Sequence, residues 1–170
     1  MLETTRIQAA ARMTLALALL ASATLLSGCT EKPEQRAMPA QALDETFKDF
    51  GNYEVHYNAL RTDELGAEIA RVYGIQRSRN RVMLNVTVLR KEAEHAPRKP
   101  VEAAVTADAY NLNGQLKDLQ LRRVSEGEAI YYIGDVSIAG SEILVFDISV
   151  TPEGTSAPLN VKLKREFVSD

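Results

Sequence analysis

Residues 82–89 read Val-Met-Leu-Asn-Val-Thr-Val-Leu, and this stretch indicates the fold class. One set of alternating side chains is wholly apolar: Val82, Leu84, Val86 and Val88. The other set includes the polar Asn85 and Thr87. Successive side chains of a strand point to opposite faces of a sheet, so one face of this segment is apolar and the other is mixed. The stretch therefore predicts a β-strand that buries one face.

The same period of two continues on both sides of this strand. Further strands are predicted at 53–59, 101–107, around Leu119 and Leu121, and at 130–138, 143–150 and 159–167. Turn signals between them are Asn113-Gly114, Glu126-Gly127, Gly140-Ser141 and Pro152-Glu153-Gly154. About seven short strands with regular turns predict a mainly β protein, an immunoglobulin-like antiparallel β-sandwich, with a small barrel as the alternative.

One segment follows a helical period instead. Its apolar residues are Leu65, Ile69, Val72 and Tyr73, which fall on a single helix face. Thr62 or Asp63 is a suitable N-cap, and Gly74 is a suitable end. The sequence thus predicts one short helix between the first two strands.

The N-terminus has the order of a secretory signal. Arg6 and Arg12 precede an apolar run at 13–26, and Ser27 and Gly28 follow it. The run is shorter than the ~20 residues that a transmembrane helix needs. We expect residues 1–28 to be a signal peptide, residues 29–46 a flexible linker punctuated by prolines, and residues 47–170 a single domain.

The segment Leu26-Ser27-Gly28-Cys29 resembles the bacterial lipobox. The resemblance implies cleavage before Cys29 and attachment of diacylglycerol to its sulfur, which makes the chain a membrane-anchored lipoprotein. The residue after Cys29 is Thr30. In bacterial lipoproteins an Asp at this position implies retention in the inner membrane, so Thr30 implies the outer membrane, with the domain facing the periplasm. The alternatives are an ordinary signal with an incidental Cys29 and an uncleaved apolar anchor.

Composition excludes several functions. The net charge of −3 offers no basic surface for nucleic acid. Cys29 is the only cysteine, so neither an intrachain disulfide nor C-x-x-C redox chemistry is available. Motifs for serine hydrolases, zinc proteases and phosphate-binding loops are missing, and no cofactor is predicted.

The strongest candidate for a metal or an acid–base pair is a polar strand face. Glu54, His56 and Asn58 alternate and would point the same way. A zinc site needs three or four protein ligands, so His95 would have to join from a loop. The competing interpretation, which we favour, is a solvent-facing polar face.

Two sets of residues are candidates for binding. Arg77, Arg79 and Arg81 would share a face if extended and could hold a carboxylate or phosphate, although ion pairs with acidic strands are the more common role. Tyr131 and Tyr132 are adjacent on a predicted strand, so they face opposite ways and at most one belongs to the core.

Several segments resemble a family of small exported bacterial proteins, catalogued as domain of unknown function 4426. They are Gly51 to Ala59, Tyr73 to Ser78, Ala129 to Ile133 and Phe146 to Gly154, and the resemblance extends over about 47–170. The family has no assigned activity, so the resemblance implies no catalytic residues.

Together these observations predict a non-catalytic periplasmic binding or envelope-associated module. Its partners would be the membrane, through the lipid anchor, and an envelope protein or cell-wall component. The alternatives are a metal-dependent or hydrolytic protein that uses Glu54 and His56, and a structural lipoprotein needed for envelope integrity.

Overall fold

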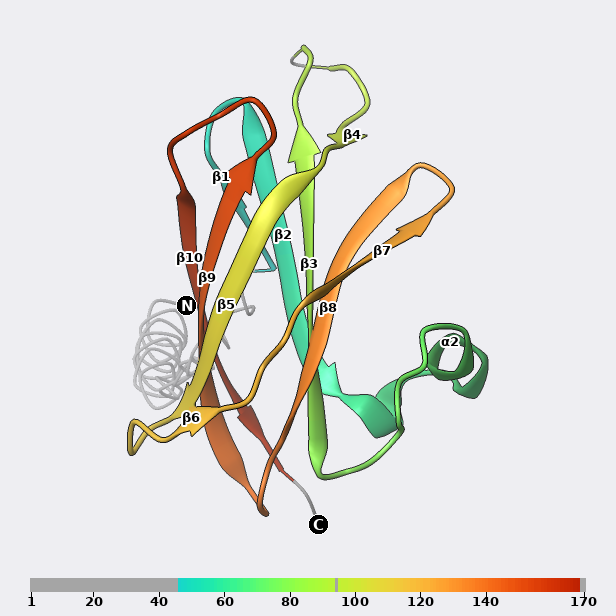
Figure 1. Ribbon diagram of the computed structural model, residues 1–170, viewed down its shortest axis with the longest axis vertical. Coiled ribbons are helices and arrows are strands. Elements are labelled where there is room, and N and C mark those ends of the chain that lie inside the picture. The colour runs from blue at the N-terminus through green and yellow to red at the C-terminus, as the bar shows by residue number, and fades with distance from the viewer. Residues whose placement is uncertain (1–45, 94, 169–170) are drawn as a thin grey trace, which may run out of the picture. The chain divides into compact units, whose positions relative to one another are not determined.

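The computed structural model describes residues 46–93 and 95–168, which form two antiparallel sheets packed face to face (Figure 1). The larger sheet has the strand order β1-β2-β3-β8-β7, with β4 paired to β3. The smaller sheet has the order β10-β9-β5-β6. This architecture confirms the predicted β-sandwich.

The strands of the larger sheet are β1 (Phe47–Asp49), β2 (Tyr53–Arg61), β3 (Arg81–Arg90), β4 (Lys99–Pro100), β7 (Arg122–Glu126) and β8 (Ala129–Ser137). Those of the smaller sheet are β5 (Ala103–Asn111), β6 (Leu116–Lys117), β9 (Glu142–Pro152) and β10 (Leu159–Phe167). A 3-10 turn, η1 (Thr62–Glu64), and helix α2 (Ala67–Val72) connect β2 to β3.

The core lies between the inner faces of the two sheets. The apolar positions of the 82–89 stretch, Val82, Leu84, Val86 and Val88, are all fully buried there. From the smaller sheet, β9 contributes Leu144, Phe146, Ile148 and Val150. This alternation is what the period of two predicts, since only every second residue of a strand can reach the core.

Polar contacts also join the sheets. The hydroxyl of Tyr132 on β8 accepts a hydrogen bond of 2.8 Å from the backbone N–H of Ala103 on β5. The guanidinium of Arg165 on β10 donates to the side-chain oxygen of Asn58 on β2 at 2.7 Å. A buried hydroxyl and a half-buried guanidinium are therefore both satisfied across the sandwich.

The predicted helix is shorter than expected and begins later. Leu65 is extended, with φ −66° and ψ 140°, so η1 and α2 are separate and Gly66 is the N-cap. Thr62 does not cap a helix: it is fully buried, and its hydroxyl donates 2.9 Å to the Gln76 carbonyl and accepts from the Ser78 N–H at the same distance. Thr62 instead fixes the loop that returns to β3.

The strand predicted around Leu119 and Leu121 is absent; the strand in this region is β7, which begins at Arg122. Leu119 and Leu121 are partly buried against the core from an irregular segment. That segment crosses β8 at Gly134, where a Cβ would lie 2.4 Å from the Gln120 carbonyl oxygen. Close passage of backbone over the strand, rather than strand pairing, explains why these leucines are buried.

The turn predictions are confirmed by the backbone. Gly127 joins β7 to β8 with φ +57°, and Gly154 lies between β9 and β10 with φ +80°. Within the described residues, no helix has the length and apolar character to cross a membrane. The predicted signal peptide at 1–28, the Cys29 lipid site and the linker up to residue 45 lie outside the described residues.

Candidate functional site

A recess on the outer face of the larger sheet is lined mostly by apolar side chains. We call it the α2 recess, and its volume is about 370 Å³. Its lining residues come from β2, η1–α2, β3, β7 and β8: Leu60, Leu65, Ile69, Tyr73, Met83, Asn85, Val124, Glu126, Tyr131 and Ile133. Volume and lining match the usual form of a small-molecule site, an apolar hollow with a few polar groups.

The floor of the recess is made by outward-facing side chains of neighbouring strands. Met83 on β3 lies opposite Leu60 on β2, and Ile133 on β8 lies opposite Asn85 on β3. Tyr131, two residues before Ile133, lies opposite Val124 on β7. Met83 and Ile133 are buried although they face away from the sandwich core, because the segment that carries α2 covers this side of the sheet.

Helix α2 and its flanks form the wall of the recess. Leu65, Ile69 and Tyr73 line it, while Val72 does not. Ile69 keeps 47% of its surface exposed and Val72 62%, so the apolar face that the sequence predicts is only partly covered. Exposed apolar surface beside an apolar hollow is the kind of feature that marks a binding site.

One end of the recess is closed by polar contacts between α2 and β7. The Tyr73 hydroxyl donates a hydrogen bond to the Glu126 carboxylate, and the Arg122 guanidinium donates to the Tyr73 carbonyl. The hydrogen bond to Glu126 and then burial raise the pKa of Tyr73 to about 12. Tyr73 therefore stays neutral and remains a hydrogen-bond donor to Glu126.

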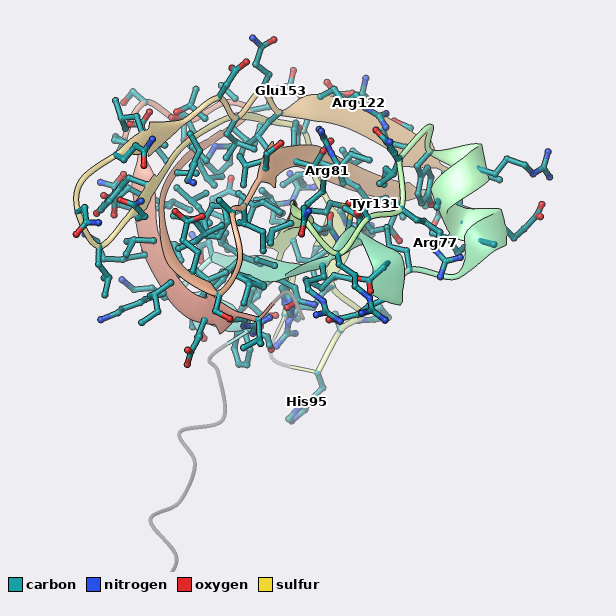
Figure 2. All side chains as sticks on the ribbon, turned by 90° about the horizontal axis from the view of Figure 1, so that it is seen from below. Arg77, Arg81, His95, Arg122, Tyr131 and Glu153 are labelled. Carbon is teal, nitrogen blue, oxygen red and sulfur yellow. The ribbon has the colours of Figure 1, made fainter. Side chains whose placement is uncertain are left out.

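Tyr131 and Tyr132 face opposite sides of β8, as the geometry of a strand requires. Tyr132 points inward and is 6% exposed, whereas Tyr131 points outward and lines the α2 recess. Figure 2 shows Tyr131, Arg77, Arg81 and Arg122 on the side of the domain that carries α2. Of the pair, only Tyr131 is in a position to contact a ligand there.

The three candidate arginines do not share a strand face. Arg77 and Arg79 lie in the loop before β3, and Arg81 begins the strand. Arg77 donates 2.7 Å to the Asp63 carbonyl, Arg79 lies 3.9 Å from the Asp63 carboxylate, and Arg81 is paired with Asp135. Arg77 thus contacts a backbone carbonyl, while Arg79 and Arg81 each lie beside a carboxylate.

Glu54 and His56 lie together on the outer face of β2. His56 Nε2 is 3.2 Å from one Glu54 oxygen, and Arg98 donates 2.9 Å to the other. The hydrogen bond from Arg98 holds the pKa of Glu54 below its ordinary value. Phe47 stacks on the His56 ring at 5.2 Å.

His95 does not join this pair. It is exposed on the loop between β3 and β4 and projects away from the other labelled side chains (Figure 2). Among residues 46–93 and 95–168, no three His, Cys, Asp or Glu side chains gather into a group that could hold a metal ion. Glu54 is thus ion-paired with Arg98 and contacts His56 through its other oxygen.

A second hollow lies on the outer face of the smaller sheet, and it is polar. Asp147 on β9 lies opposite Asp108 on β5 and Lys162 on β10. Its carboxylate is 3.0 Å from the Lys162 ammonium and accepts 2.8 Å from the Tyr110 hydroxyl. The charges of Asp147 and Lys162 compensate each other, and Asp108 adds a second carboxylate, so this hollow is more polar than the α2 recess.

The recess itself was not foreseen from the sequence. The sequence treats Met83 and Ile133 only as strand residues, yet Met83 belongs to the half of the 82–89 stretch that faces outward. The sequence does contain two signals for it. One is an apolar residue on the strand face opposite the core, and the other is a nearby short helix with an apolar face. The missing information was that the chain folds α2 back over this face.

The fold and site define a class: a two-sheet antiparallel sandwich domain with an apolar recess on one outer face. The family model described as "Domain of unknown function (DUF4426)" matches residues 47–170, and this chain belongs to that family. A search of curated proteins finds no match to the sequence.

Solved structures with a similar fold include the following three. A DUF4426 family protein from Pseudomonas aeruginosa PAO1 is 35% identical, with 73% of this chain and 94% of that chain covered and a TM-score of 0.61. FetP of uropathogenic Escherichia coli strain F11, recombinantly expressed in the periplasm, is 9% identical, with a TM-score of 0.52. The match covers 73% of this chain and 93% of FetP. A copper-bound variant of FetP is 11% identical over 73% and 95%, also with a TM-score of 0.52. At these identities the FetP structures show the fold alone.

Proposed function

We propose that this chain is a lipid-anchored, non-catalytic domain of the bacterial envelope that binds a small apolar molecule in the α2 recess. The anchor is Cys29, at the end of the signal-like segment. Two or more acyl chains on one N-terminus give stable membrane attachment. Thr30 supports the outer membrane, with the domain in the periplasm.

The observation that carries the binding proposal is the apolar lining of the α2 recess. Leu60, Met83, Tyr131 and Ile133 form one side, and Leu65 and Ile69 form the other. Burying apolar surface yields roughly 25 cal/mol for each Å² removed from water. A ligand that covers the half-exposed Ile69 and fills the hollow gains this energy without any rearrangement of the sheets.

Hydrolytic or metal-dependent chemistry at Glu54 and His56 has less support. Both oxygens of the Glu54 carboxylate are engaged, one by Arg98 and the other by His56. A general base has to be available to the substrate, and a metal ligand has to be available to the metal. The Glu54 carboxylate instead lies beside two cations, Arg98 and Lys91, the second at 3.6 Å.

Binding of a peptide by strand addition is also less favoured. The larger sheet ends in β1 with three residues and β7 with five. On one side the smaller sheet ends in β6, whose two residues cover only Ala109 and Tyr110 of β5. On the other side it ends in β10, which has nine residues and carries Lys162, Lys164 and Arg165. Short strands and charged side chains are the usual means by which edges resist pairing.

The binding proposal is tested with Nile red, a neutral dye that fluoresces in apolar surroundings. The protein used is residues 29–170 with Cys29→Ala, which contains the whole compact unit 42–170. Ile69→Ser removes an apolar side chain from the recess, and Val72→Ser makes the same kind of change on the same helix outside it. Both side chains are exposed, so neither change threatens folding.

We expect the dye to bind with one saturable site and to lose about fivefold or more in affinity in Ile69→Ser, because apolar contact is lost. Val72→Ser should bind as the parent does. Equal binding by all three proteins, or no saturable binding, would refute the recess as the site. Separately, Cys29→Ala in the full chain should abolish membrane retention in cells, and unchanged retention would refute the anchor.

A further inference from the structure

Asn85 on β3 occupies the boundary between two hollows. It lines the α2 recess, and it also lines a polar recess of about 210 Å³. The polar recess is lined by Thr46, His56, Tyr57, Asn58, Asn85 and Thr87. In the sheet, Asn85 lies opposite Ile133 on one side and Asn58 on the other. The outer face of the sheet therefore changes from apolar to polar at this residue.

The side-chain oxygen of Asn85 has no hydrogen-bond partner. Among the described residues, three buried side-chain atoms have none: Arg61 Nε, Asp63 Oδ1 and Asn85 Oδ1. The first two lie 3.2 Å from each other as an ion pair, so they compensate one another. A buried acceptor without a donor destabilises the folded protein, and a ligand that supplies the donor removes this penalty.

Within the described residues no neighbour donates a hydrogen bond to the Asn85 oxygen, and three of the polar atoms around it have other partners. The Thr87 hydroxyl donates 3.2 Å to the Ile130 carbonyl. His56 Nε2 lies 3.2 Å from the Glu54 carboxylate. The oxygen of Asn58 is an acceptor, held by Arg165 at 2.7 Å. The unmet requirement at Asn85 is thus for a donor that comes from outside the protein.

The two hollows that meet at Asn85 indicate the form of the ligand. The α2 recess is lined mostly by apolar side chains, and the open acceptor lies at its polar edge. Resting on the proposed function of the α2 recess, we propose that the ligand is an amphiphile. Its apolar body fills that recess, and its hydroxyl or amide N–H donates to Asn85 Oδ1.

The test compares two isomers that differ only in whether they carry a donor. 1-Octanol has a hydroxyl, and 1-methoxyheptane has the same atoms but no O–H. Each is used to displace Nile red, which itself has no donor, from residues 29–170 with Cys29→Ala. We expect 1-octanol to displace the dye at about tenfold lower concentration than the ether, since one hydrogen bond to a buried acceptor is worth roughly 1.4 kcal/mol.

Asn85→Leu should remove this preference while dye binding persists, and Asn160→Leu, the same substitution on the outer face of β10, should leave it intact. If Asn85→Leu does not fold, Asn85→Ala gives the same comparison. Equal displacement by both isomers in the parent protein, or a preference that survives in the Asn85 variants, overturns the proposal. If Ile69→Ser also leaves the affinity for the dye unchanged, the proposed function itself is refuted. If Ile69→Ser weakens dye binding, only the amphiphile proposal is refuted.

Discussion

The hydroxyl of Tyr73, at the end of α2, donates a hydrogen bond to the carboxylate of Glu126, the last residue of β7. These residues are far apart in sequence, and their contact holds the short helix beside the sheet. A helix of six residues is not stable by itself, so its position depends on such tertiary contacts. The contact therefore keeps the wall of the α2 recess in place.

Replacing Tyr73 by Phe should loosen α2 without unfolding the sandwich. The lost hydrogen bond is worth about 0.5–1.5 kcal/mol, which corresponds to roughly fivefold faster exchange of helix amides that open locally. Hydrogen exchange at the amides of Ala70 and Tyr73, which donate to Gly66 and Ile69, measures this. Tyr110→Phe, which removes a hydroxyl bonded to Asp147 on the other sheet, should leave these amides unchanged. Faster exchange in both variants, or in neither, would contradict this role.

Stability should fall in acid through Glu54. The Arg98 hydrogen bond lowers the pKa of Glu54 in the folded protein below the ordinary 4.5. Its contribution is thus fully present above pH 4.5 and is lost as the pH falls through the folded pKa. Urea unfolding across this range should show a weaker loss in Glu54→Gln than in the parent. Glu153→Gln, at an exposed turn residue labelled in Figure 2, is the control, and parallel acid curves for Glu54→Gln and the parent would refute the prediction.

Gly134→Ala should destabilise the sandwich. The added Cβ would lie 2.4 Å from the Gln120 carbonyl oxygen, which belongs to backbone and cannot simply rotate away. Forced overpacking of this kind costs about 1–3 kcal/mol, measurable as a lower urea midpoint. Gly66→Ala is the matched control, since its Cβ would meet only Ile69 Cγ1 at 3.9 Å. An unchanged midpoint in Gly134→Ala would mean that the 118–121 segment does not cross β8 closely.

The sequence is most informative where burial repeats with a fixed period. The 82–89 stretch predicts β3 and its buried face, and Gly127 and Gly154 mark turns because their positive φ suits glycine. It fails where burial has another cause. Leu119 and Leu121 lie on the segment that crosses β8 and are partly buried against the core, which alternation cannot distinguish from a strand.

The candidate site is predicted only in part, for a related reason. The alternation of strand residues predicts only that Tyr131 and Tyr132 face opposite ways, and in the structure it is Tyr131 that lines the α2 recess. The partners of Arg77, Arg79 and Arg81 and the open acceptor of Asn85 depend on strand register and loop path. These are long-range properties that no local pattern in the sequence records.

The most direct test of ligand binding in the α2 recess uses Met83, which is buried in its floor. Residues 29–170 contain two methionines, Met38 and Met83, so ¹³C-methyl labelling of methionine gives two signals, assigned with Met83→Leu. We predict that adding 1-octanol shifts the Met83 methyl resonance to saturation and leaves that of Met38 unchanged. A Met83 resonance that stays in place at concentrations of 1-octanol that displace Nile red would contradict the account.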